Sequence, residues 1–484
     1  MVIPKEVKSV LKKLTEEGYE AYIVGGCVRD LLRGIEPKDW DVTTSAKPEE
    51  IEKLFKKSFY ENKFLTVTVQ TDSKIPSLKE IEVTTYRSEA KYSDKRHPDE
   101  VRFAKTLKED LSRRDFTVNA MAVSDNGEII DPFSGQKDLK DKLIKTVGDP
   151  EKRFGEDALR MMRAARFAAT LGKDWQIEPE TASAIEKNAP WLQAISKERI
   201  RDELVKIIMS ERAAEGIELL RKLGLLEYIM PELLEGCGVS QNKHHIYGCY
   251  EHSLRSLEYA AKQGFNMHVR MAALLHDIAK PRVKQGEGDD ATFYNHEVVG
   301  AKMTARLLER LKFPKKDIEK IAKLVRYHLF YYNVDEVTES SVRRLVRQVG
   351  PENMEELLQV RMADRIGSGV PKAEPYKLRH LKYVIEKVSR DPISVRMLKV
   401  NGEDVMRQLG IKPGPKIGHI LDILLGYVLN DPKKNKKEWL TKEIVTLGKL
   451  DNVTIQTMAD KARKEREKLE MKKDEMAKKK YWVT

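Results

Sequence analysis

The stretch PKDWDVTTSA, residues 37–46, places Asp39 and Asp41 on either side of a tryptophan, in a chain whose formal net charge is +12. Two like charges on neighbouring side chains repel unless a cation lies between them. On a β-strand, residues i and i+2 point to the same face, so we expect both carboxylates to project together at a sheet edge. Hard oxygen ligands of this kind suit Mg²⁺. The stretch predicts a metal site for phosphoryl transfer, with a pair of solvated loop aspartates as the alternative.

Length and composition predict a multidomain, helix-rich chain, because 484 residues exceed what one hydrophobic core usually supports. No run of eighteen apolar residues occurs, and the N-terminus lacks the apolar region of a signal peptide. The three cysteines form no CxxC pair and no disulfide framework. We therefore expect a cytoplasmic protein without membrane contact. The excess of 89 Lys+Arg over 77 Asp+Glu favours a polyanionic partner such as nucleic acid.

The texture of the sequence changes near residue 150. Before it, short β-type runs alternate with helical stretches, as in an α/β or α+β domain. After it, apolar residues recur at helical spacing and strand-like alternation almost vanishes. We expect an α+β chain, with a mixed β-sheet in an N-terminal head and an all-α remainder. The Lys-rich segment 461–480 is expected to be a solvated helix or a disordered basic arm.

Two segments in the N-terminal part supply groups suited to phosphates. VGGCVRDLL, residues 24–32, predicts a strand that ends at two glycines, followed by a helix whose first turn carries Arg29. Glycines there let backbone N–H groups approach a triphosphate, and a helix N-terminus favours negative charge. EDLSRRDFTVNAMAV, residues 109–123, brings Arg113 and Arg114 beside Asp115, just before another predicted strand.

The stretch GEDALRMMRAARF, residues 155–167, carries Asp157, Arg160, Arg163 and Arg166 at three-residue steps on one predicted helix. A planar guanidinium and a carboxylate can read the edge of a base, and further arginines can hold phosphates. An ion-paired helix surface is the structural alternative.

Together, GGCVRDLL, DWDVTTSA, RRDFTVNA, DPFSGQKDL and EDALRMMRAARF resemble the successive motifs of class II tRNA nucleotidyltransferases, the CCA-adding enzymes, which share them with bacterial poly(A) polymerases. The resemblance covers residues 20 to about 210 in the order and spacing of the family. It implies that Asp39 and Asp41 bind the catalytic Mg²⁺ ions. It also implies a nucleotide-binding set, in which Gly26, Arg29 and Arg113 contact the triphosphate, Asp157 and Arg160 pair with the base of CTP or ATP, and Arg163 and Arg166 complete the site.

Three further features of the head concern a third carboxylate, a loop and a local turn. A third carboxylate is expected at Glu82 or at Asp110. The segment 88–109 lies where the family has a flexible loop that is needed for the switch from C to A addition. Leu65-Thr66 stands where the family carries Gly-Thr, a departure that concerns the local turn rather than the chemistry.

A second constellation lies in the helical half, where His252, His276-Asp277 and Asp364 follow in the order H…HD…D. An adjacent His and Asp at a helix end can coordinate one metal ion, which ligands from other helices complete. The run resembles the HD phosphohydrolase superfamily, and His296 and His328 match the histidines that some members use for a second metal. The resemblance implies a metal-dependent phosphatase or 2′,3′-cyclic phosphodiesterase. Imidazole ligands favour Ni²⁺, Co²⁺ or Mn²⁺. A degenerate, purely structural HD module is the alternative.

Residues 397–440 resemble the C-terminal segment of bacterial family members with an HD domain, a segment thought to hold tRNA. The expected division is therefore a nucleotidyltransferase head at 1–145, a base-reading helical neck at 146–225, an HD domain at 226–385, and a helical tRNA-binding region with a basic tail at 386–484.

The resemblance implies template-independent addition of CCA to the 3′ end of tRNA from CTP and ATP. CC-only or A-only addition is one alternative. A poly(A) polymerase is another, although those enzymes usually carry a GRRFRLAHV-like stretch where this chain has ENKFLTVTV, residues 61–69. The last is an RNA-binding protein in which only the HD domain is catalytic.

Overall fold

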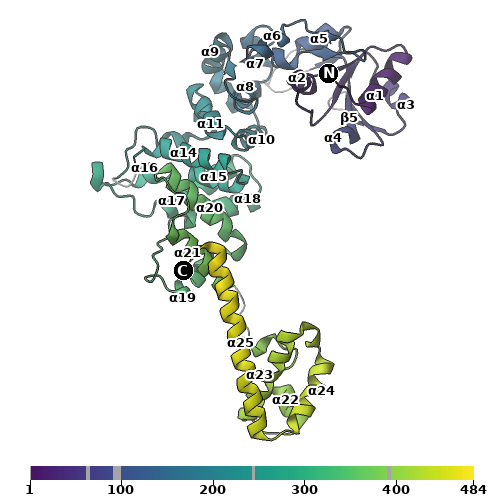
Figure 1. Ribbon diagram of the computed structural model, residues 1–484. Helices are drawn as coiled ribbons and strands as arrows, with labels where there is room; N and C mark the ends of the chain where they lie inside the picture. The colour runs from purple at the N-terminus through teal and green to yellow at the C-terminus, as the bar shows by residue number, and fades with distance from the viewer. Residues whose placement is uncertain (1, 62–65, 91–99, 243–245, 390–393, 484) are drawn as a thin grey trace. The chain divides into compact units, whose positions relative to one another are not determined.

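The computed structural model describes residues 2–61, 66–90, 100–242, 246–389 and 394–483. The chain forms two compact units, shown in Figure 1: unit 1 comprises residues 1–329 and 355–371, and unit 2 comprises residues 330–354 and 372–484. Within the described ranges, no helix combines the length and the apolar character needed to cross a membrane.

A seven-stranded mixed sheet forms the centre of the head, in the order β3-β4-β5-β2-β1-β8-β9. β2 and β5 are parallel, and every other neighbouring pair is antiparallel. This sheet confirms the expected α+β head. Its strands are β1 (Ala21–Val24), β2 (Asp41–Thr44), β3 (Ser58–Glu61), β4 (Thr66–Gln70), β5 (Glu80–Thr85), β8 (Ala122–Val123) and β9 (Ile129–Ile130).

Short helices cover the sheet, and the apolar face of the first helix supplies Val7, Leu11 and Leu14 to a core shared with strand residues such as Val42 and Val83. A separate hairpin, β6 (Arg87–Ala90) with β7 (Glu100–Phe103), flanks residues 91–99. The helical elements of the head are α1 (Lys5–Glu16), α2 (Gly26–Leu32), α3 (Pro48–Leu54), α4 (Pro76–Lys79), α5 (Leu107–Ser112), the 3-10 turn η1 (Thr117–Asn119) and α6 (Gly135–Lys140).

The rest of unit 1 is helical apart from one two-residue parallel pair, β10 (Leu143–Ile144) with β11 (Gln176–Ile177), within the part of the chain that the structure describes. The first group of helices is α7 (Pro150–Glu156), α8 (Leu159–Thr170), α9 (Pro179–Asn188), α10 (Lys197–Ile208), α11 (Ala213–Lys222), α12 (Leu226–Ile229) and α13 (Pro231–Leu234). The second group is α14 (Cys249–Lys262), α15 (Met267–Leu275), α16 (Lys280–Val283), α17 (His296–Arg310), α18 (Lys315–Tyr327) and α20 (Met354–Gly367).

Unit 2 is built around one long helix, α25 (Asn452–Tyr481), drawn in yellow in Figure 1. Near its start, Ile455 and Ala459 pack into an apolar cluster with three other helices of the unit. Near its end, Lys480 and Tyr481 contact Glu386. The segment 461–480 is therefore helical, which confirms the first of its two expected states. The other helices are α19 (Glu339–Val349), α21 (Tyr376–Ser389), α22 (Gly402–Leu409), α23 (Pro415–Asn430) and α24 (Lys437–Gly448).

Candidate functional site

The two aspartates of the opening stretch lie where β2 begins. The strand starts at Asp41, whereas Asp39 precedes it in an exposed bend, so the prediction that both lie on the strand is wrong for Asp39. Trp40, between them, is buried in the core of the head. Because Trp40 anchors this turn inward, Asp39 stays exposed, whereas Asp41 at the start of β2 is half-buried.

Glu82 lies directly beside Asp41, because the parallel pairing of β2 with β5 places these two residues in register. Both line a cavity of about 280 Å³, together with Arg87, Arg113 and Arg114. Burial raises the pKa of Asp41 to about 6, and the negative charges of Glu82 and Asp39 add to the effect while Arg114 opposes it. Asp41 and Glu82 therefore place two carboxylates side by side on one wall of the cavity, and such hard oxygen donors suit Mg²⁺.

The turn between β1 and α2 keeps space open beside Asp41. Gly25 has φ +84°, a backbone conformation that favours glycine. A Cβ at Gly25 would lie 2.8 Å from Nη1 of Arg114 and 3.3 Å from Oδ2 of Asp41. Gly26 opens α2, and Arg29 on that helix is buried and donates to Oδ1 of Asn119 at 2.7 Å. The predicted strand, double-glycine turn and helix are confirmed.

Asp110, the other candidate for a third carboxylate, is fully buried and does not line the cavity. Its Oδ1 lies 2.8 Å from Nη2 of Arg113. Of the two candidates, Glu82 is thus the carboxylate placed beside Asp41. The central part of the predicted flexible loop, residues 91–99, and Leu65 lie outside the described residues.

Asp157 does not share a helix with the arginines that follow it, contrary to the prediction. It ends α7, and its Oδ1 accepts from the backbone N–H of Leu159 at 3.0 Å, which separates α7 from α8. Its carboxylate also accepts two hydrogen bonds from Arg199, at 3.2 and 2.7 Å. Arg160 lies on α8 and donates to the backbone oxygen of Arg113 at 3.1 Å. Both predicted base-reading side chains are therefore held by neighbouring groups.

The next two arginines of α8 bind buried carboxylates. Arg163 pairs with Asp115 at 2.6 Å, and Arg166 pairs with Glu203 at 2.6 Å. Asp115 also accepts from the side-chain amide of Asn119 at 3.1 Å. Burial alone would raise the pKa of Asp115, but Arg163, Asn119 and the nearby Arg160 together hold it below its ordinary value. Asp115 thus connects α8 to the head through an ionised carboxylate.

The Asp115→Asn variant is expected to lower the free energy of unfolding by about 2 kcal/mol at pH 7, because Arg163 loses its short ion pair and keeps only the longer contact with Glu203, at 4.0 Å. A carboxyl whose folded-state pKa is depressed stabilises the fold above its unfolded pKa and loses that contribution as the pH falls through the folded one. The difference between wild type and variant should therefore shrink below about pH 4. Urea unfolding at pH 7 and at pH 3 measures this difference in the free energy of unfolding. An equal difference at both pH values would contradict a stabilising ion pair between Asp115 and Arg163.

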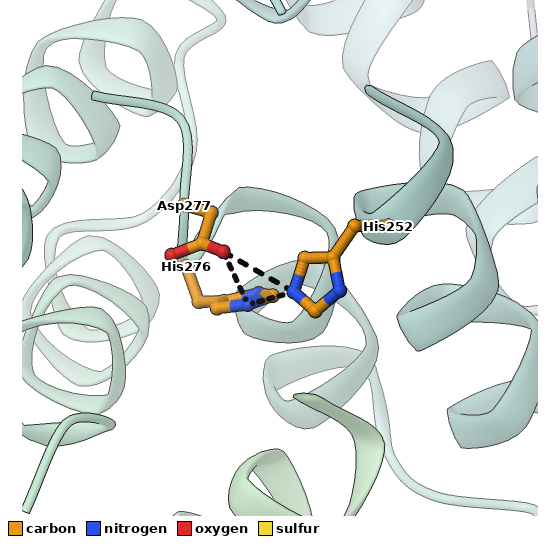
Figure 2. Close-up of side chains that lie close together, drawn as sticks. All are labelled: His252, His276 and Asp277. Atoms are coloured by element: carbon orange, nitrogen blue, oxygen red, sulfur yellow. Dashed lines mark hydrogen bonds and ion pairs between the residues drawn. The ribbon is translucent and has the colours of Figure 1, made fainter. Parts of the chain in front are cut away.

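The histidines of the helical half converge on Asp277. Nε2 of His252 lies 2.8 Å from Nε2 of His276 and 3.1 Å from Oδ2 of Asp277. Figure 2 shows these three side chains turned toward one another, with dashed lines joining them in a triangle. On the other side of the carboxylate, Oδ1 lies 3.4 Å from Nε2 of His296 and 3.7 Å from that of His328. Two groups of three ligand atoms, each within 4.8 Å of one another, therefore share Asp277.

The orientation of the rings suits metal binding. Nδ1 of His276, His296 and His328 each lies 2.7–2.9 Å from the backbone carbonyl oxygen three residues earlier. A carbonyl only accepts, so Nδ1 of each ring carries a proton, and Nε2, which faces Asp277, is the nitrogen that can ligate a metal when it is deprotonated. Burial opposes a charge on His276, but Asp277 and Asp364 raise its pKa to about 10. The carboxylates thus attract a positive charge that a divalent cation would supply.

Asp364 completes this group from α20, with Oδ1 at 3.4 Å from Nε2 of His252. Lys280 was not predicted; it is buried and lies 2.7 Å from Oδ2 of Asp277. The structure thus brings together every residue of the H…HD…D order and both additional histidines. Burial lowers the pKa of His328 to about 3, with His276 adding to the effect, which leaves a neutral imidazole of the kind that ligates metals.

The sequence does not predict several other contacts in the two sites. Arg199 and Glu203 lie on α10, far along the chain from the groups that they bind, and no local spacing signals these contacts. Asp115 and Asn119 follow Arg113 and Arg114 closely in the sequence. Their contacts with Arg163 and Arg29 are seen only in the structure. Fold and site together define a nucleotidyltransferase head joined to helical modules, one of which carries a cluster of buried metal-ligand groups.

Comparisons with known proteins identify the family. Residues 21–145 match the model of the poly A polymerase head domain, residues 174–237 that of the probable RNA and SrmB-binding site of polymerase A, and residues 249–367 that of the HD domain. A CCA-adding enzyme of Ligilactobacillus salivarius is 33% identical over 466 residues, which cover 91% of this chain and 99% of that protein. The chain belongs to the class II tRNA nucleotidyltransferases, the family of the CCA-adding enzymes, and carries an HD domain.

Two further similarities bear on the reaction. An A-adding tRNA nucleotidyltransferase of Deinococcus radiodurans is 36% identical over 332 residues, covering 66% of this chain and 74% of that protein. The crystal structure of a Bacillus stearothermophilus CCA-adding enzyme in complex with CTP aligns with a TM-score of 0.58 and 29% identity, over 92% of this chain and 98% of that one.

Proposed function

We propose that this protein adds CCA to the 3′ end of tRNA without a nucleic-acid template, using CTP and ATP and releasing pyrophosphate. The observation that carries the proposal is the pairing of Asp41 with Glu82 in a cavity that also holds Arg113 and Arg114. Acidic side chains on one side and guanidinium groups on the other suit a metal-bound nucleoside triphosphate. The CCA-adding relatives, which match nearly the whole chain, support the same reaction.

In the head, Asp39, Asp41 and Glu82 would hold Mg²⁺, which lowers the pKa of the attacking 3′-hydroxyl and screens the phosphates. Arg113 and Arg114 orient the triphosphate and attract the negative charge that develops on the departing pyrophosphate. Gly25 and Gly26 leave room for the phosphates because they carry no side chain. Arg29, held by Asn119, stands on the helix that follows this turn.

In the neck, Asp157 and Arg160 would pair with the base, and Arg163 and Arg166 would complete the site. The bonds from Arg199 to both oxygens of Asp157 support this role, since they fix the orientation of a carboxylate that must accept from the exocyclic amine of C or A. Protein side chains would thus select the nucleotide.

The Asp157→Ala variant is expected to relax the choice among nucleotides. A site built to hydrogen-bond a base rejects the wrong base through polar groups left unpaired, so removal of the carboxylate should reduce discrimination against UTP and GTP by about 10²-fold. Single-nucleotide incorporation with each NTP gives the ratio of kcat/KM values, and the Kd for tRNA serves as the control. Unchanged exclusion of UTP and GTP would place base reading elsewhere.

In the helical half, His252, His276, Asp277 and Asp364 would hold one metal ion, and Asp277, His296 and His328 a second. We propose a transition metal such as Ni²⁺, Co²⁺ or Mn²⁺ there, because imidazole ligands favour these ions. The reaction that suits this site is metal-dependent hydrolysis of a phosphate ester, such as a 2′,3′-cyclic phosphate.

The proposed functional division is a head at 1–145, a neck at 146–225, an HD domain at 226–385 and a tRNA-binding region at 386–484. The HD range draws residues from both structural units. Unit 2 contains 30 Lys and Arg against 20 Asp and Glu, so it carries +10 of the net charge of +12. This charge supports a role of unit 2 in binding the phosphates of tRNA. We propose that the protein acts in the cytoplasm.

The decisive experiment supplies tRNA that ends at the discriminator base with CTP, ATP or both. Complete CCA ends in the presence of both nucleotides confirm the proposal. The similarity to an A-adding tRNA nucleotidyltransferase supports A-only addition as a second candidate function. An enzyme of that kind would extend only tRNA that already ends in CC. Products that stop at CC, or long A tracts, would identify the remaining alternatives.

A further inference from the structure

We propose that Asp110 is a positioning residue that holds Arg113 and Arg114 toward the nucleotide cavity. The inference rests on the proposed function of the head and extends it to a residue behind the cavity. Asp110 lies on α5 and is fully buried, whereas the two arginines follow that helix and line the cavity beside Asp41.

The carboxylate of Asp110 contacts both arginines. Its Oδ1 accepts from Nε of Arg113 at 3.0 Å and from Nη2 at 2.8 Å, a two-pronged contact with one guanidinium. Its Oδ2 lies 3.6 Å from Nη2 of Arg114. One buried negative charge therefore serves two neighbouring positive charges, whose side chains are only 14% and 18% exposed.

The same carboxylate is fixed from the opposite side by the strands of the head. The hydroxyl of Thr43 donates to Oδ2 at 3.2 Å, and the backbone N–H of Arg87 lies 3.4 Å from Oδ1. Thr43 is on β2, two residues after Asp41, and Arg87 opens β6. Asp110 thus sets the arginine pair at a fixed place relative to the strand that carries Asp41.

The arrangement explains why a buried acid lies next to the cavity. Adjacent guanidinium groups repel each other, and in the absence of nucleotide they would turn away into solvent. With Asp110 as a common partner, both stay oriented for the phosphates, so binding requires less reorganisation. Asp110 itself does not line the cavity, and its carboxylate is already bound by Arg113 and Thr43, whereas Asp41 and Glu82 face the cavity.

The Asp110→Asn variant keeps the size of the side chain and an acceptor for Thr43 but removes the charge. We expect the KM for CTP and ATP to rise about tenfold or more, with the Kd for tRNA within about twofold. The inhibition constant of pyrophosphate should rise in parallel, since the product depends on the same arginines. A structural defect alone would not raise the KM for nucleotide and the inhibition constant of pyrophosphate while the Kd for tRNA stays unchanged.

Asp138→Asn is the matched control, because Asp138 is also a buried aspartate of the head that accepts from a threonine hydroxyl, that of Thr117. It should leave both constants near wild type. If Asp110→Asn does not fold, Thr43→Val tests the same contact and should raise the KM for nucleotide in the same direction. The double variant Asp110→Asn with Arg113→Lys should raise the KM for nucleotide by less than the product of the two single fold-changes, because both changes disrupt the same contact.

An unchanged nucleotide KM in Asp110→Asn, or in Thr43→Val where the first variant is unfolded, overturns the inference. Equal effects in Asp110→Asn and Asp138→Asn, or strict additivity with Arg113→Lys, also overturn it. These results leave the proposed function intact as long as wild type adds nucleotides to tRNA. Absence of addition by wild type would contradict the proposed function itself.

Discussion

The Asp41→Asn variant is expected to lose nucleotide addition by about 10³-fold or more, while its affinity for tRNA stays near wild type. Asparagine has nearly the size of aspartate, so the packing of β2 should persist. It removes the charge that stands in register with Glu82 and borders the cavity. Without that charge, the site would bind a divalent cation weakly, and the 3′-hydroxyl would remain a poor nucleophile.

Single-turnover addition of CMP to tRNA measures the chemical step, and filter binding measures the Kd for tRNA. Glu82→Gln should show a loss in the same direction, since Glu82 is the carboxylate beside Asp41. The matched control is again Asp138→Asn, which changes a buried aspartate away from the cavity. Addition at the wild-type rate by Asp41→Asn in Mg²⁺ would refute the assignment of the head.

The second large effect is expected from the double variant His276→Ala with Asp277→Ala. It removes the shared carboxylate and one imidazole of the metal-ligand cluster. We expect loss of bound transition metal and loss of 2′,3′-cyclic phosphate hydrolysis to background. CCA addition should stay within about threefold, because the head and neck retain their own carboxylates and arginines.

Elemental analysis of the purified protein and hydrolysis assays with Ni²⁺, Co²⁺ or Mn²⁺ check the first two expectations. His268→Gln with Asp317→Asn is a suitable control, since this His–Asp pair in the same unit, at 2.8 Å, lies outside the cluster. Loss of CCA addition by the His276/Asp277 variant at an unchanged Tm would contradict the independence of the two sites. Wild type without bound metal and without hydrolysis would favour a structural HD domain.

Much of the local structure follows from the sequence because it depends on neighbours in the chain. The glycine pair before Arg29 predicts a strand, a tight turn and a helix, since only glycine tolerates φ +84° without strain. The apolar spacing after residue 150 predicts the helical half for the same local reason. The sequence also names all six side chains of the group around Asp277 in the helical half, because they stand in a recognisable order; their role as metal ligands stays a prediction.

Two local predictions were wrong in detail, and both fail at element boundaries. Asp39 lies before β2 because the buried Trp40 anchors the turn, and Asp157 lies before α8 because its side chain binds the N–H of Leu159. At such boundaries, hydrogen bonds from side chains compete with the regular backbone hydrogen bonds, and the spacing of residues in the sequence does not show which of the two will form.

The residue types of both sites, their order along the chain and most of the elements that carry them can be predicted from the amino-acid sequence. The contacts between distant residues cannot: the folded chain places Glu82 rather than Asp110 beside Asp41, Arg199 on Asp157, and Asp277 between two groups of histidines. The two kinds of feature depend on interactions of different range. Turns and helices depend on contacts between near neighbours, whereas strand pairing and helix packing depend on the burial of apolar faces across the whole unit.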